Sequence, residues 1–109
     1  MIKTTVLIPV RDNNGRRFPT ELRRTLEARF LRFGGFTCEA GIEGAWEQHG
    51  RIYRDRSYQY IVSLASWNDF PAWLEDVHWA RKAFQQEALY IEVAGTTEVI
   101  AGSDDLALD

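Results

Sequence analysis

The sequence predicts an α+β fold of the ferredoxin-like type. In this βαββαβ sandwich, two helices cover one face of a four-stranded antiparallel sheet. Three observations favour it. Apolar residues switch between strand and helix spacing in the order strand, helix, strand, strand, helix, strand. A long β-hairpin is expected at residues 42–65, between the two helical segments. The chain has 109 residues, 45% of them hydrophobic, which is enough for one domain with an ordinary core.

The first half of the chain begins with a β-branched apolar strand at residues 4–10, followed by a polar turn that contains Asn14-Gly15. Pro19 then stands where a first helical turn tolerates proline. The expected helix has an apolar stripe, while Glu27 and most of the arginines lie off it. The stripe consists of Leu22, Leu26, Phe30 and Phe33. Gly34-Gly35 is expected to end this helix.

The predicted hairpin strands are residues 36–48 and 51–65, joined by a two-residue turn at His49-Gly50. Gly41 and Gly44 inside the first of these strands indicate a bulge or a bend. Ser66 caps the second predicted helix, which runs to about Gln86. A last strand follows at residues 88–94. We expect one domain at residues 1–101 and an acidic flexible tail at 102–109.

Composition narrows the function classes. The single cysteine, Cys38, cannot form an internal disulfide, and no signal-peptide or membrane-spanning pattern is present, so a cytoplasmic location is expected. Residues 1–60 carry eleven basic and seven acidic side chains, whereas residues 61–109 carry two basic and nine acidic ones. We expect the two signs to mix on one surface.

The second predicted helix carries His78, which is expected at the surface. With two histidines and one cysteine, no metal site and no cofactor are predicted.

The sheet face away from the helices is expected to be too apolar to remain in water. Strand alternation places Leu7, Ile61 and Tyr90 on this face. Each large apolar side chain left exposed forgoes roughly 1.5–3 kcal/mol of burial energy. We therefore expect a homodimer that pairs through this face and encloses a pocket beside it.

Five residues are candidates for ligand binding. Trp46 suits either a ligand wall or packing in the core or interface. Arg54 and Arg56 share a strand face and could clamp an anion, or could form cross-strand ion pairs with nearby glutamates. Tyr90 and Glu92 lie at the open face, where the carboxylate could act as a base or pair with an arginine of a second copy.

The chain also resembles a family of small bacterial proteins known only as a domain of unknown function. The resemblance is carried by Gly44-Ala45-Trp46, by Gly50, by Arg54-Asp55-Arg56-Ser57, and by Phe84-Gln85-Gln86-Glu87-Ala88-Leu89. It spans most of residues 4–94. It implies the ferredoxin-like fold and no particular activity.

Three functions remain open. The first is a homodimeric module that binds a small anionic or aromatic ligand through the five candidate residues. The second is a cofactor-free enzyme built like the dimeric α/β-barrel monooxygenases and isomerases, with Glu92 or His49 as its base. The third is nucleic-acid binding through arginines of the first half, namely Arg16, Arg17, Arg23, Arg24 and Arg51.

Overall fold

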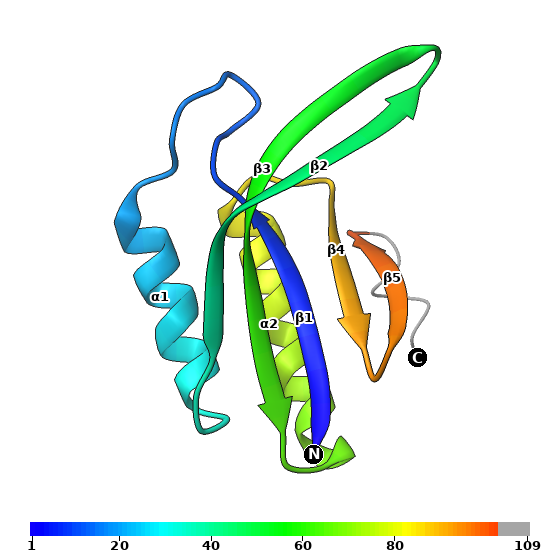
Figure 1. Cartoon of the computed structure of the whole chain (residues 1–109). Helices are drawn as coiled ribbons and strands as arrows, with labels where there is room; N and C mark the ends of the chain where they lie inside the picture. Colours follow the sequence, from blue (N-terminus) through cyan, green and yellow to red (C-terminus); the bar gives the residue numbers. More distant parts are fainter. Residues whose placement is uncertain (103–109) are drawn as a thin grey trace.

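The chain folds into one antiparallel sheet with two helices on one side of it (Figure 1), as seen in a computed structural model that describes residues 1–102. Most of the predicted acidic tail, residues 103–109, lies outside the described residues. The strands are β1 (Ile2–Pro9), β2 (Thr37–Gln48), β3 (Arg51–Leu64), β4 (Ala88–Val93) and β5 (Thr96–Ala101). The helices are α1 (Thr20–Leu31) and α2 (Phe70–Ala83), and a short 3-10 turn, Trp67–Asp69, leads into α2.

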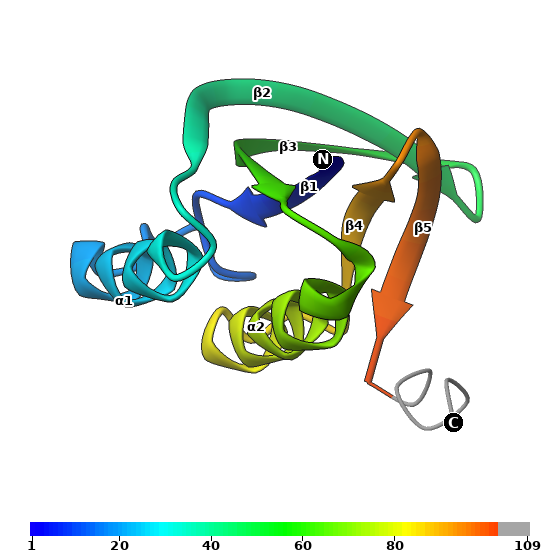
Figure 2. The same cartoon turned by 90° about the horizontal axis from the view of Figure 1, so that it is seen from below.

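The sheet has the strand order β2-β3-β1-β4-β5. Both helices lie against the same face, as the view from below shows (Figure 2). The predicted α+β architecture, with two helices on one face and the first and third strands at the centre, is confirmed. The predicted number of strands is wrong, because the described residues form five strands and not four.

The fifth strand is β5, which pairs with β4 through a two-residue turn at Ala94-Gly95. Both turn residues have positive φ angles, 51° at Ala94 and 85° at Gly95. Alanine rarely adopts this conformation, so Ala-Gly is a weak hairpin signal beside Asn-Gly. The sequence therefore indicates the end of β4 at Gly95 and does not indicate the return strand.

The hairpin of β2 and β3 extends well beyond the rest of the sheet (Figure 1). Its turn is the predicted one, with φ angles of 55° at His49 and 75° at Gly50. The predicted bulge is also present, because the register shifts between Glu39 and Ile42 and Gly41 has a φ of 74°. We call residues 44–56 the hairpin arm. The arm places exposed side chains away from the core.

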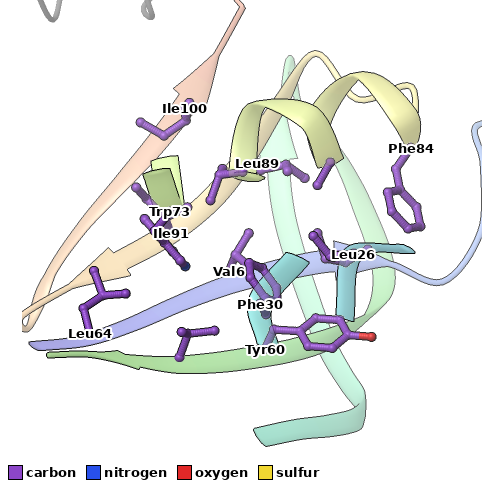
Figure 3. Packing of buried hydrophobic residues seen from close by; sticks show 14 residues of the cluster. Val6, Leu26, Phe30, Tyr60, Leu64, Trp73, Phe84, Leu89, Ile91 and Ile100 are labelled. Atoms are coloured by element: carbon purple, nitrogen blue, oxygen red, sulfur yellow. The ribbon is translucent and has the colours of Figure 1, made fainter. Parts of the chain in front are cut away.

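The core lies between the sheet and the helices (Figure 3). Its members are apolar side chains from β1, β3, β4 and β5 together with one stripe from each helix. The labelled members are Val6, Leu26, Phe30, Tyr60, Leu64, Trp73, Phe84, Leu89, Ile91 and Ile100. The predicted stripe of α1 is confirmed in part, because Leu26 and Phe30 are fully buried.

Two carboxylates are also buried on the helix side. Asp76 of α2 accepts hydrogen bonds from Arg29 at 2.9 Å and from Arg32 at 2.8 and 2.9 Å, which ties α2 to the end of α1. Glu27 of α1 is almost fully buried, although the helical pattern places it off the apolar stripe. His78, expected at the surface, is half-buried in α2.

The face away from the helices carries the predicted apolar side chains together with polar ones, since Thr5 of β1 lies between Ile61 and Glu92. We define the open face by Leu7 of β1, Ile61 of β3, Tyr90 of β4 and Val99 of β5, which alternation and register place on this side. Leu7 and Ile61 are partly covered by their neighbours, whereas Tyr90 is 44% exposed and Val99 is 56% exposed.

Candidate functional site

A cavity of about 200 Å³ lies on the helix side, at the end of β1 where the loop before α1 meets β3 and the end of α2. Its lining combines basic, aromatic and small side chains and contains no acidic residue. The lining residues are Pro9, Val10, Arg17, Phe18, Thr20, Arg23, Tyr58 and Phe84. We call this cavity the arginine pocket. Its residues come from four separate parts of the chain, so only the fold brings them together.

One wall of the arginine pocket is a cation stacked on an aromatic ring. The guanidinium carbon of Arg23 lies 3.7 Å from the ring centroid of Tyr58. Arg17 approaches the same tyrosine from the loop, with Nη2 donating to its hydroxyl at 3.4 Å. Phe18 and Phe84 meet edge to face at 5.0 Å and form the apolar side. The accessible lining of the pocket is mostly polar, with two positive charges beside aromatic rings.

Arg23 is fixed in this wall by two buried partners. Its Nε donates to the Tyr60 hydroxyl at 3.2 Å, and its Nη2 lies 3.7 Å from Glu27 Oε2. The Tyr60 hydroxyl in turn donates to Glu27 at 2.7 Å. Arg24 adds a hydrogen bond to the other Glu27 oxygen at 2.8 Å. Figure 3 shows the Tyr60 ring beside Phe30, with its hydroxyl directed away from the apolar cluster.

The electrostatics of this network favour a charged arginine beside a neutral tyrosine. Burial, followed by the hydrogen bond to Glu27, raises the pKa of Tyr60 above its usual value. Burial alone would lower the pKa of Arg23, but the hydrogen bond to Tyr60 and the coulombic interaction with it, followed by the corresponding interactions with Tyr58, raise that pKa. Arg23 consequently stays positively charged and Tyr60 stays protonated at neutral pH.

Sequence reasoning missed the arginine pocket for a definable reason. Strand alternation from Ile61, predicted on the open face, directs Tyr60 toward the helices, but a tyrosine pointing inward does not reveal its hydroxyl partners. A weak signal does exist in α1, where Arg23, Arg24 and Glu27 stand at the i,i+4 and i,i+3 spacings of side-chain pairs. Such pairs are usually surface features, so the spacing alone does not indicate a buried network.

The predicted candidates on the hairpin divide between its two faces. Trp46 is 50% exposed and packs on Tyr53 with ring centroids 4.3 Å apart. By strand alternation this pair lies on the same side as the open face. Arg54 and Arg56 lie on the opposite side, in line with Tyr58 of the arginine pocket. The expected sharing of one strand face by the two arginines is thus present.

One of these arginines has an acidic partner. Arg56 donates to Glu43 on the neighbouring strand at 3.1 Å, with both side chains exposed, which matches the cross-strand alternative. Arg54 lies opposite Ala45.

The two remaining candidates lie in β4, on the side of the open face. Tyr90 lies opposite Val99, and Glu92 lies opposite Thr5 on one side and Thr97 on the other. The structure therefore separates Tyr90 and Glu92, together with Trp46, from the arginine pair. The five candidates do not converge on one point within a single copy of the chain.

Residues 1–102 contain no group of three or more His, Cys, Asp or Glu side chains placed to hold a metal ion. In the same part of the chain, neither helix has the length and apolar character that a membrane span requires.

Comparisons with known proteins give likeness in fold. No protein-family model and no curated protein matches the sequence. Among solved structures, a phage SAM lyase in complex with S-methyl-5'-thioadenosine has 18% identity and a TM-score of 0.67, over 94% of this chain and 90% of the lyase. The divalent cation tolerance protein CutA1 from Thermus thermophilus has 11% identity and a TM-score of 0.52, over 93% of this chain and 82% of that one.

Proposed function

We propose that this protein binds a small organic ligand in the arginine pocket. The observation that carries the proposal is the Arg23–Tyr58 stack at the wall of the cavity. A ring enclosed beside a fixed guanidinium can stack on a flat ligand, and the guanidinium can also donate hydrogen bonds to it. Aromatic side chains next to placed polar groups are typical of small-molecule sites.

The size of the cavity limits how much of a ligand it encloses. At about 200 Å³, it is smaller than the roughly 300–1,000 Å³ of pockets for drug-sized molecules. The rest of a larger ligand would extend along β3, where Arg56 and Arg54 continue the strand face of Tyr58. In this arrangement both arginines keep their proposed role as ligand contacts.

We further propose that the open face is covered by a second copy of the chain. Tyr90 and Val99 are large and about half exposed there, and pairing two such faces removes them from water. Trp46 and Glu92 lie on the same side, where they would line the space enclosed between the two copies.

Dimerisation can be tested with a matched pair of charge substitutions. Val99→Glu places a carboxylate on the open face, whereas Leu31→Glu places one on an equally exposed position of α1, since Val99 is 56% and Leu31 is 58% exposed. Sedimentation at micromolar concentration should show a dimer for the native protein and for Leu31→Glu, and a monomer for Val99→Glu. A native protein that is already monomeric would contradict the proposal.

The fold shared with the phage SAM lyase makes adenosine thioethers the first ligands to test. We expect S-methyl-5'-thioadenosine to bind in calorimetric titrations, with its ring system on the Tyr58–Arg23 wall. Tyr58→Leu should weaken binding about tenfold, since stacking on aromatic rings contributes roughly 1–3 kcal/mol. Tyr53→Leu, which removes an aromatic ring from the hairpin arm, should leave it unchanged. Equal effects of the two substitutions would place the ligand elsewhere.

A second candidate is a cofactor-free enzyme, favoured by the same fold likeness to a lyase. Incubation with S-adenosylmethionine and chromatographic detection of released S-methyl-5'-thioadenosine would reveal such turnover. If Glu92 is the base, Glu92→Gln should abolish release while binding persists, and Glu98→Gln on the neighbouring strand should not. Loss of turnover in His49→Gln alone would assign the base to the hairpin tip.

Nucleic-acid binding has less support from the geometry. Two of its five arginines, Arg23 and Arg24, are engaged with Glu27 and Tyr60 on the helix side. A titration with oligonucleotides at low salt tests this alternative, because phosphate contacts give binding that weakens steeply as salt rises.

A further inference from the structure

We propose that the arginine pocket is a site for a phosphate or carboxylate group, with Arg17 as the arginine that binds it. The inference rests on the proposed function and specifies the ligand class of the same pocket. It depends on the charges of the pocket lining, on the partners of its two arginines and on the local structure that positions Arg17.

The charges of the lining are one-sided. Two guanidinium groups, from Arg17 and Arg23, face a cavity of about 200 Å³ whose lining residues include no Asp or Glu. A cationic group entering this space would meet two like charges, of which only that of Arg23 is offset, by Glu27 outside the lining. An anionic group would meet donors that bind carboxylates and phosphates with matched, forked geometry. The pocket therefore favours anions over cations.

The two arginines differ in how far their hydrogen-bonding capacity is already used. Arg23 is committed to Tyr60 and Glu27, and its charge is offset by that carboxylate. Arg17 has one hydrogen bond, the 3.4 Å contact with the Tyr58 hydroxyl, and no ion pair to any described residue. A guanidinium carries five N–H donors, so most of those on Arg17 remain for a ligand.

The loop before α1 holds Arg17 at the pocket. Arg11 and Arg17 form an antiparallel bridge, and Phe18 N–H donates to the Val10 carbonyl at 3.2 Å. Asp12 stabilises the tip of this loop, with Oδ1 accepting from the backbone N–H groups of Asn14 and Arg16 at 2.9 Å each. Arg17 is therefore presented from a backbone that is already ordered, which lowers the entropy cost of binding a ligand.

Further donors face the same space. The hydroxyl of Tyr58 accepts from Arg17, so its own proton is left to donate to an anion. Thr20 contributes a second hydroxyl to the lining. Phosphate and carboxylate oxygens accept hydrogen bonds from hydroxyl and guanidinium groups, and this cavity offers both kinds of donor. The sulfonium and ammonium groups of S-adenosylmethionine are cations, and these lining residues include no negatively charged side chain to pair with them.

Orthophosphate is a suitable probe because it isolates the anionic group from any ring. Two-dimensional NMR of the full chain, at constant ionic strength, should show saturable phosphate-induced shifts at the amides of Phe18 and Thr20. Arg17→Gln should weaken the apparent affinity about tenfold or more, as expected for the loss of a hydrogen bond between charged groups. Arg16→Gln removes the same charge from the adjacent exposed position, and it should change the affinity less than about twofold.

The outcomes separate this inference from the proposed function. Saturable binding of phosphate that depends on Arg17 supports the inference, whether or not S-methyl-5'-thioadenosine binds. The inference is wrong and the proposed function stands if that neutral thioether binds while the phosphate-induced NMR shifts rise linearly with phosphate concentration. The same holds if the two arginine substitutions change those shifts equally. If neither compound binds, both are wrong.

Discussion

Replacing Tyr60 by phenylalanine removes one oxygen atom from the network that fixes the arginine pocket. The ring is fully buried and packs at 5.7 Å from the rings of Phe30 and Phe36, contacts that phenylalanine preserves. The hydroxyl donates to Glu27 at 2.7 Å and accepts from Arg23 at 3.2 Å. The substitution therefore changes hydrogen bonding and leaves the shape of the core almost intact.

The size of the expected loss follows from these two bonds. Hydrogen bonds to charged groups contribute about 1.5–3 kcal/mol each. Arg23 is partly exposed, so water can replace part of what it loses, and Glu27 keeps its bond from Arg24. We expect Tyr60→Phe to lower the free energy of unfolding by about 2 kcal/mol. With a urea slope near 1.5 kcal/mol per molar, the midpoint should fall by about 1.3 M.

Tyr90→Phe is the matched control, because it deletes the same atom from a side chain that is 44% exposed on the open face. Its free energy of unfolding should stay within about 0.5 kcal/mol of the native value. Urea unfolding followed by tryptophan fluorescence measures both variants. Equal losses in the two variants would show that the Tyr60 hydroxyl does not stabilise the fold, and the argument for a fixed Arg23 would fail with it.

The stability difference between the native protein and Tyr60→Phe should also depend on pH. Burial raises the pKa of Tyr60 above the ordinary 10.0, so the folded protein favours the protonated phenol. This contribution to stability is complete below pH 10.0 and is lost as pH rises further, because only the unfolded chain then ionises at this position. The stability gap between the native protein and Tyr60→Phe should narrow above pH 10.0. A constant gap would contradict the assigned hydrogen bonding.

Three further outcomes are expected. Asp76→Asn should cost about 2–3 kcal/mol in urea unfolding, because it leaves Arg29 and Arg32 without their buried carboxylate, whereas Glu75→Gln on the same helix should cost little. Burial raises the pKa of the Cys38 thiol, so iodoacetamide should modify it more slowly in the folded protein than in urea, and equal rates would contradict this. His49→Asn should raise the urea midpoint slightly, since asparagine tolerates the 55° φ angle of the hairpin turn better; a lower midpoint would count against it.

Local signals explain how much of the fold the sequence predicts. Helical stripes, glycines with a required positive φ and a two-residue turn are each encoded within a few residues, so α1, α2, the bulge at Gly41 and the turn at His49 were all foreseeable. Strand β5 was not, because its turn places alanine where glycine or asparagine is usual.

The candidate site depends on contacts between distant residues, and these have no local pattern. Arg17 and Tyr58 are 41 residues apart, and Arg29 and Asp76 are 47 apart. The strand pattern indicated that Arg54 and Arg56 could pair with nearby glutamates, and the structure shows such a pair at Arg56. It could not indicate which arginines would be paired and which left free. That distinction separates a structural charge from a candidate ligand contact.

The uneven charge of the two halves gains a physical meaning in the fold. Ion pairs within residues 1–102 engage five of the basic side chains, namely Arg23, Arg24, Arg29, Arg32 and Arg56. Asp76 from the acidic half neutralises two of them across the helix pair. The uncompensated cations of the first half are then concentrated in the loop before α1 and on the hairpin arm. Of these cations, Arg17 lines the arginine pocket. A charge left unpaired beside a cavity, while the other arginine of that cavity is matched to Glu27, is the arrangement that an anionic ligand would complete.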